Sequence, residues 1–159
     1  MIGWRAARAA SRRLGLGRAE DEELVAEVEN DSCSVDALQS MLSTTFGKGN
    51  LLFYDHGKQV FTVTDRNRGR AVRVAFVAED AKPKLADGST DREAFMQTLL
   101  EAPDERLFKV EEVEARPPGE AVIEPSLECA RCGEPTQRSK TVEVGGQRLC
   151  RPCAREVAP

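Results

Sequence analysis

The stretch CARCGEPTQRSKTVEVGGQRLCRPC, residues 129–153, decides the fold of the C-terminal part of this chain. It contains two C-x₂-C pairs about 17 residues apart, a spacing typical of structural zinc sites. Two thiolates two residues apart can hold one ion from a tight turn, and a second pair completes a tetrahedron. The alternative is a pair of redox dithiols, although that chemistry ordinarily uses a single C-x-x-C motif between a strand and a helix. We predict one structural Zn²⁺ site, with the ligands Cys129, Cys132, Cys150 and Cys153.

The residues beside and between the pairs predict two cysteine turns joined by a β-hairpin. Gly133 follows Cys132, and a residue without a Cβ lets the backbone fold tightly round a metal-bound sulfur. Thr141–Val144 alternates as a strand does, and Gly145-Gly146 is a hairpin turn pattern. A zinc ribbon this short has little core of its own, so the metal should supply much of its folding free energy.

Composition limits the classes to which the chain can belong. Its 159 residues suit one medium domain with a small appendage, and 40% apolar residues suffice for a core. A net charge of −4 argues against nucleic-acid binding by the whole chain, and no apolar run approaches the ~20 residues of a membrane span. Five cysteines, four of them in metal-site spacing, favour a reducing cytoplasm over a disulfide scaffold.

The first 18 residues carry five arginines and no acidic residue, a composition that overlaps with that of an organelle transit peptide. The alternative is a surface helix that ends near Gly15 or Gly17. In that helix we expect Trp4, Ala7 and Leu14 to face inward and the arginines to face solvent.

The remaining pattern predicts an α+β domain at residues 1–116, a Pro-rich linker at 117–127 and the ribbon at 128–157. We expect an antiparallel β-meander packed with helices, with hairpin turns at His56-Gly57 and Asn67–Gly69. A short helix should begin at Cys33, and a second should follow the capping box Thr90–Glu93. The strands are expected at Leu24–Val28, Leu51–Tyr54, Val60–Thr64, Val72–Val77 and Leu107–Val113.

Several motifs, in order along the chain, resemble the family of the formylmethanofuran dehydrogenase E subunit. They cover most of the chain, from about Trp4 to Ala154, and include the N-terminal helix, which favours the helix over the transit peptide. The matching segments are Asp31–Gln39, Thr45–Leu51, Gly57-Lys58, Ala71–Val74 and the two terminal cysteine pairs.

The resemblance implies an α+β metal-binding domain with a zinc-ribbon tail, commonly paired as a homodimer. It also implies an accessory protein associated with a larger molybdenum or tungsten enzyme of one-carbon metabolism. The family typically has a His-x-His-x-Cys-Pro-Gly stretch before its first helix, but the sole histidine here is His56. It also tends to have a cysteine where this chain has Thr44, which leaves Cys33 alone in the main domain. One thiolate cannot hold a zinc ion, which needs at least three protein ligands.

Two residues of the main domain are weaker candidates for ligand binding, Cys33 and Lys48. Cys33 at a helix start could be a nucleophile, but no histidine base accompanies it, so we expect a buried structural thiol. Lys48 lies in Gly47-Lys48-Gly49, which departs from the phosphate-loop pattern but leaves the lysine available to an anion. We expect His56 to be a solvated turn residue rather than a ligand.

Three functions remain open. The first is a zinc-binding accessory or interaction protein that is non-catalytic on its own, since no acid–base or nucleophile cluster is visible. The second is a metal-dependent redox or one-carbon enzyme whose first metal site needs residues upstream of Met1. The third is a zinc-ribbon regulator that binds nucleic acid. Six basic and three acidic residues from Cys129 to Pro159, combined with −2 for Zn²⁺ and four thiolates, leave about +1, which argues against the third.

Overall fold

The computed structural model describes residues 1–78 and 82–157, and the chain divides into two compact units, Met1–Ala121 and Val122–Pro159. The first unit is an α+β domain, as expected. Its five-stranded sheet has the order β2-β1-β3-β4-β5. The strands are β1 (Leu24–Val28), β2 (Leu51–Phe53), β3 (Val60–Asp65), β4 (Arg70–Phe76) and β5 (Phe108–Val113).

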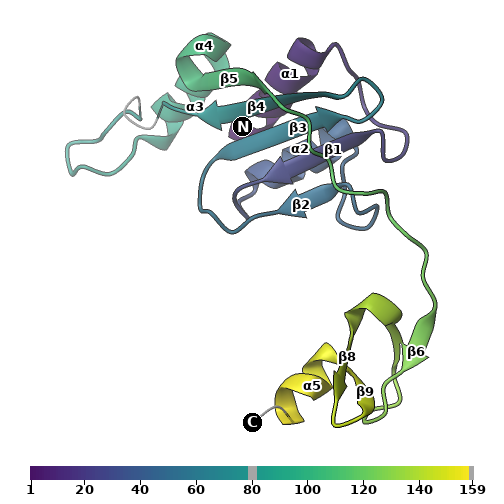
Figure 1. Ribbon diagram of the computed structural model, residues 1–159. Coiled ribbons are helices and arrows are strands. Elements are labelled where there is room, and N and C mark those ends of the chain that lie inside the picture. Colours follow the sequence, from purple (N-terminus) through teal and green to yellow (C-terminus); the bar gives the residue numbers. More distant parts are fainter. Residues whose placement is uncertain (79–81, 158–159) are drawn as a thin grey trace. The chain divides into compact units, whose positions relative to one another are not determined.

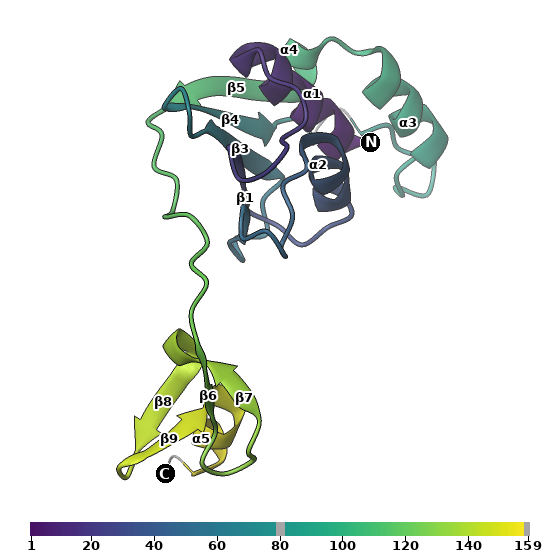
Figure 2. The ribbon, with the colours of Figure 1, turned by 90° about the vertical axis from the view of Figure 1, so that its right-hand side faces the viewer.

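Helices α1 (Ile2–Leu14) and α2 (Ser34–Leu42) lie on the same side of this sheet (Figure 2). Alternate residues of the strands, such as Val72 and Val74 of β4, point toward them and are fully buried. Leu38 and Leu42, four residues apart on α2, add to the same core. The fold therefore has one helical layer over one face of the sheet.

The expected meander is confirmed for β3, β4 and β5, which pair antiparallel in sequence order, but the hairpin expected between β2 and β3 is wrong. Strand β2 instead pairs in parallel with β1, and β1 pairs antiparallel with β3 on its other edge (Figure 1). Helix α2 makes the crossover that a parallel pair requires. The segment after β2 passes the end of β1, where the Tyr54 N–H donates to the Val28 carbonyl at 2.9 Å.

Helix α1 ends as predicted, at a C-cap Gly15 with φ 65°, but the expected inward face is wrong at two positions. Trp4 is 40% exposed, with the Arg8 guanidinium 4.6 Å from its ring centre. Arg5 is 3% exposed, because its guanidinium is satisfied by oxygens of a distant segment. It donates to the carbonyls of Leu99 (2.6 Å) and Ala102 (2.7 Å) and to the Asp104 carboxylate.

Those oxygens belong to the segment that holds α3 (Arg92–Glu101) and α4 (Asp104–Leu107) before β5. Asp91 rather than Thr90 caps α3, accepting a hydrogen bond from the Ala94 N–H. Leu99 of α3 and Leu107 of α4 are buried in the main core, and the Arg5 contacts add polar links between this segment and α1.

The second unit contains two small β-hairpins and a helix. Strands β6 (Ser126–Glu128) and β7 (Pro135–Gln137) pair antiparallel, as do β8 (Thr141–Val144) and β9 (Gln147–Cys150). A short 3-10 turn, η2 (Arg138–Lys140), separates the hairpins, and α5 (Arg151–Val157) follows β9. None of the described helices has the length and apolar character needed to cross a bilayer.

Candidate metal centre

The first cysteine pair lies in the turn between β6 and β7. The Cys129 N–H donates to the Glu134 carbonyl at 3.1 Å, and the Gly133 N–H donates to the Cys129 carbonyl at 2.9 Å. Gly133 has φ 75°, a left-handed conformation that favours glycine. The Cys-x-x-Cys-Gly order therefore closes a tight turn that carries both thiols.

The second pair is placed differently from the expected second turn. Cys150 is the last residue of β9, and Cys153 lies in the first turn of α5. The hairpin that leads to it is as expected, because Gly145 and Gly146 have φ 59° and 77°, the values of a tight I′-type turn. A strand end and a helix start thus present the second pair of sulfurs.

The four Sγ atoms come together, all within 4.8 Å of one another. Cys132 Sγ and Cys150 Sγ are 3.9 Å apart. Four sulfurs at about 2.3 Å from a central zinc ion would be separated by roughly 3.8 Å, so the cluster has the size of a tetrahedral site. All four cysteines are free thiols. The residues present therefore fit a single ion held by sulfur alone.

Backbone donors prepare one of these thiols for ionisation. N–H groups of Cys132 and Cys150 lower the pKa of Cys129 to about 6, and the Cys150 N–H lies 3.2 Å from its sulfur. Hydrogen bonding with Cys150, together with burial, raises the pKa of Cys153 to about 12. A cluster of four sulfurs cannot release all of its protons unless a cation compensates the charge, which is the electrostatic condition that a metal ion meets.

Little else holds the ribbon. Its buried apolar cluster consists of Leu149 and Ala154 together with the sulfurs of Cys129 and Cys150. Arg131, which the sequence did not single out, forms an ion pair with Glu156 at 2.8 Å and donates to the Cys153 carbonyl at 3.4 Å. The position of Arg131 between Cys129 and Cys132 could have predicted this contact, because a residue within one cysteine pair lies near the other pair when the four sulfurs meet.

The two weaker candidates lie in the other unit, and neither has the surroundings expected of it. Cys33, at the N-cap of α2, is exposed, so the expectation of a buried thiol is wrong. The Lys48 ammonium is enclosed by oxygens of its own fold, at 3.1 Å from the Glu20 carbonyl, 3.4 Å from that of Asp21 and 3.1 Å from the Ser43 hydroxyl. These contacts assign Lys48 to holding the loop before β2.

His56 is exposed, as expected, but lies in the link after β2 rather than in a hairpin turn. Its Nδ1 is 3.2 Å from a Glu29 carboxylate oxygen, and its ring stacks on Tyr54 with 5.8 Å between ring centres. Within the described part of the chain, the four ribbon cysteines are the one group of at least three His, Cys, Asp or Glu ligands close enough to share an ion.

Comparison with known families places the larger unit. The model of the family described as "FmdE, Molybdenum formylmethanofuran dehydrogenase operon" matches residues 1–109. The chain belongs to the FmdE family. The family resemblance inferred from the sequence motifs is thereby confirmed, and the four-cysteine unit follows the segment that the family model matches.

A solved structure of an FmdE-like protein supports the fold. A tungsten formylmethanofuran dehydrogenase FmdE-like protein from Syntrophus aciditrophicus superimposes with a TM-score of 0.66 at 21% identity, over 99% of this chain and 83% of that one. A protein of Archaeoglobus fulgidus, named a probable S-adenosyl-L-methionine-binding protein, is 30% identical over 87% of this chain. The chain spans only 44% of that protein's length, and the S-adenosyl-L-methionine binding in its name is attributed to that longer protein.

Proposed function

We propose that this chain is a zinc-binding accessory or interaction protein of the FmdE family, non-catalytic on its own. The observation that carries the proposal is the convergence of four cysteine sulfurs within 4.8 Å. Four protein ligands occupy all four coordination positions of a tetrahedral zinc ion, whereas a catalytic zinc keeps one position for water or substrate. Such a site stabilises the fold of the ribbon, and the surface of the folded ribbon can then contact a partner protein.

The donor set favours zinc among the biological metals. Four thiolates in a tetrahedron suit Zn²⁺ or a thiolate-bound iron, and they exclude the hard cations that prefer oxygen. A thiolate site of this kind persists in a reducing compartment, in keeping with a cytoplasmic protein. The family relationship further supports a homodimer that associates with a larger molybdenum or tungsten enzyme.

The test is metal analysis of the full chain purified without added metal. We expect close to one zinc per chain, no visible absorption from iron–sulfur charge transfer, and release of four titratable thiols when the metal is chelated. A metal-free chain, or cysteines joined in disulfides, would overturn the proposal. The matched control is Cys33→Ser, which should bind the same amount of zinc as the natural chain.

A second candidate is a metal-dependent redox or one-carbon enzyme that uses Cys33. The observation that favours it is the packing of α1 on α2: a Cβ on Gly3 would lie 1.9 Å from the Ser34 carbonyl oxygen. The start of α1 therefore adjoins the start of α2, where Cys33 is exposed. Metal ligands located before α1 would therefore lie near the Cys33 thiol and could bind the same ion.

The two candidates are separated by a second metal equivalent. An enzyme of this kind should bind more than one metal ion per chain when its N-terminal ligands are supplied as the fused stretch His-x-His-x-Cys-Pro-Gly, and Cys33→Ser should abolish the excess. One equivalent in both fused proteins would contradict the enzyme and leave the accessory role standing.

A further inference from the structure

Strand β5 forms one edge of the sheet, and no other described strand pairs with its outer side. The Leu107 carbonyl accepts from the Val77 N–H at 2.9 Å, which fixes the alternation of the β4–β5 ladder. Lys109, Glu111 and Val113 then exchange hydrogen bonds with β4, following the observed register. The backbone groups of Val110 and Glu112 therefore point outward, where they offer a donor and an acceptor each.

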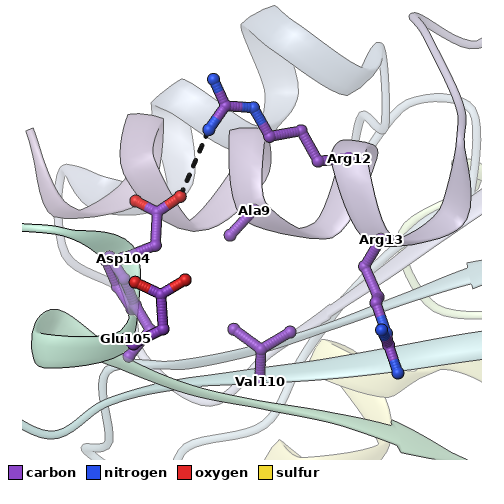
Figure 3. Close-up of a pocket in the computed structure, with 7 residues that line it drawn as sticks. Ala9, Arg12, Arg13, Asp104, Glu105 and Val110 are labelled. Atoms are coloured by element: carbon purple, nitrogen blue, oxygen red, sulfur yellow. Dashed lines mark hydrogen bonds and ion pairs between the residues drawn. The ribbon is translucent and has the colours of Figure 1, made fainter.

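A hollow of about 570 Å³ runs beside this edge, between α1, α4 and β5 (Figure 3). Ala9, Phe108 and Val110 give it an apolar floor, and Phe108 is buried in the main core. Arg12 and Arg13 come from α1 on one side, and Asp104 and Glu105 come from α4 on the other. The hollow is thus an amphipathic groove beside a strand that lacks a neighbour.

Positive charge exceeds negative charge around the groove. Asp104 alone faces three guanidinium groups, since Arg5 binds it directly and those of Arg8 and Arg12 lie 3.5 Å away. Glu112 similarly faces Arg13 and Arg70, each at 3.1 Å. The hollow itself is lined by two arginines and two carboxylates. Their ion-pair partners beside it are Arg5, Arg8, Arg70 and Glu112, so the surroundings as a whole hold five arginines and three carboxylates, an excess of two positive charges. Arg12 and Arg13 are 66% and 58% exposed, so a ligand can reach them.

We propose that this groove binds an extended acidic segment of a partner protein, which adds to the sheet as a sixth strand beside β5. The segment would pair with the outward backbone groups of Val110 and Glu112, the general mode by which sheet edges capture peptides. Side chains two residues apart in a strand share a face. The proposed motif is therefore an aliphatic residue two positions from a carboxylate, with the first on Val110 and the second on Arg12 or Arg13.

Charge selects this occupant over a second copy of the chain. Pairing two β5 edges would bring together two grooves whose surroundings each hold an excess of two positive charges, whereas an acidic segment neutralises that excess. The inference extends the proposed accessory role by naming the chemistry of a partner, but it rests on the first unit alone and not on the metal.

The experiment uses the full, metal-loaded chain and the blocked heptapeptide TTVTETT as the probe. We expect saturable binding that weakens with salt, with amide NMR shifts concentrated at Val110 and Glu112. The peptide TTVTKTT and a TTVTETT peptide methylated on the valine nitrogen should each bind at least about tenfold more weakly. Equal binding of the lysine peptide, or shifts elsewhere in the sheet, would overturn the proposal.

Variants locate the site. Arg12→Ala with Arg13→Ala should weaken TTVTETT binding about tenfold, whereas Lys109→Ala, on the opposite face of β5, should leave it unchanged. Val110→Pro removes an outward N–H without breaking the β4 ladder, so it should abolish binding in a chain whose thermal unfolding is retained. Three results contradict the proposal: no binding at millimolar peptide, equal binding by free glutamate, and dimerisation through β5 that displaces the peptide.

Discussion

The two units of this chain reach their folds by different means. In the described part of Met1–Ala121, twenty buried apolar side chains form a single cluster between the sheet and the helices, whereas that of Val122–Pro159 contains a cluster of four, two of which are cysteines. Burying apolar area stabilises the first unit without help from a ligand. The second has little such area, and under the proposed function a metal ion joining its sulfurs would supply the missing stability. The first unit therefore has an apolar core that can hold its fold, whereas the second has a sulfur cluster in the place of such a core.

The largest expected effect is the loss of one sulfur ligand. Cys129→Ser should release the metal and unfold the ribbon, because metal binding in such units is worth about 10–16 kcal/mol. Native mass spectrometry would measure the bound ion, and far-UV circular dichroism the lost hairpins. Fluorescence of Trp4, the single tryptophan of the chain, should not change, because it reports on the first unit only.

Cys33→Ser is the matched control for that variant. Cys33 is exposed and outside the sulfur cluster, so the change should alter neither metal content nor the free energy of unfolding by more than about 0.5 kcal/mol. Loss of zinc in this control would show that the units are not independent.

The next effect tests the first unit. Arg5→Ala should lower its free energy of unfolding by about 3–5 kcal/mol, because Asp104 and two carbonyls lose their buried partner. Urea unfolding followed by Trp4 fluorescence would measure it, with the zinc content unchanged. Arg12→Ala, at a side chain 66% exposed, should cost less than about 1 kcal/mol. Equal losses of unfolding free energy in the two variants would contradict the stabilising role of the buried Arg5 contacts.

A smaller loss is expected where α1 meets α2. Gly3→Ala would place a Cβ against the Ser34 carbonyl, and the helices must separate to admit it, at a cost of about 1–3 kcal/mol. Gly17→Ala is the control, since a Cβ there meets nothing within 4 Å. A stabilised Gly3→Ala protein would mean that the contact between the helices is looser than described.

The smallest effect concerns pH. Burial opposes ionisation of Asp104, but the Arg5 hydrogen bond and the Arg5 charge outweigh it and lower the pKa of the carboxyl. A lowered native pKa adds stability above the ordinary value of about 4, and that stability is lost as the pH falls through the native value. The urea concentration at which half of the first unit is unfolded should therefore decrease as the pH is lowered below about 4. Asp104→Asn should flatten this dependence, and an unchanged slope would refute the assignment.

Much of both units could be predicted from the sequence. The cysteine spacing and the Gly145-Gly146 turn are local features, and they predicted the hairpin and the convergence of four sulfurs. The β1 bounds and the end of α1 at Gly15 were likewise predicted from local patterns. Such features succeed because a turn or a cap depends on a few adjacent residues.

The errors arose where distant segments decide the structure. The β2–β3 hairpin was expected from a turn pattern at His56-Gly57, but helix α2 brings β2 to the other edge of β1. Arg5 was expected to face solvent like the other arginines of its helix. It is buried because it binds oxygens 94–99 positions away, which the local pattern does not show. No local pattern announces either contact, since both depend on which segments the completed sheet and helices bring together.

The central claim, that metal binding folds the ribbon and leaves the α+β domain unaffected, is tested most directly by titrating Zn²⁺ into the metal-free, reduced chain while amide NMR signals are recorded residue by residue. We expect the signals of described ribbon residues from Ser126 onward to change from unfolded to dispersed positions and to saturate at one equivalent, while those of β1, β3 and β4 stay in place. Dispersed ribbon signals before any zinc is added, or sheet signals that move together with them, would contradict the account.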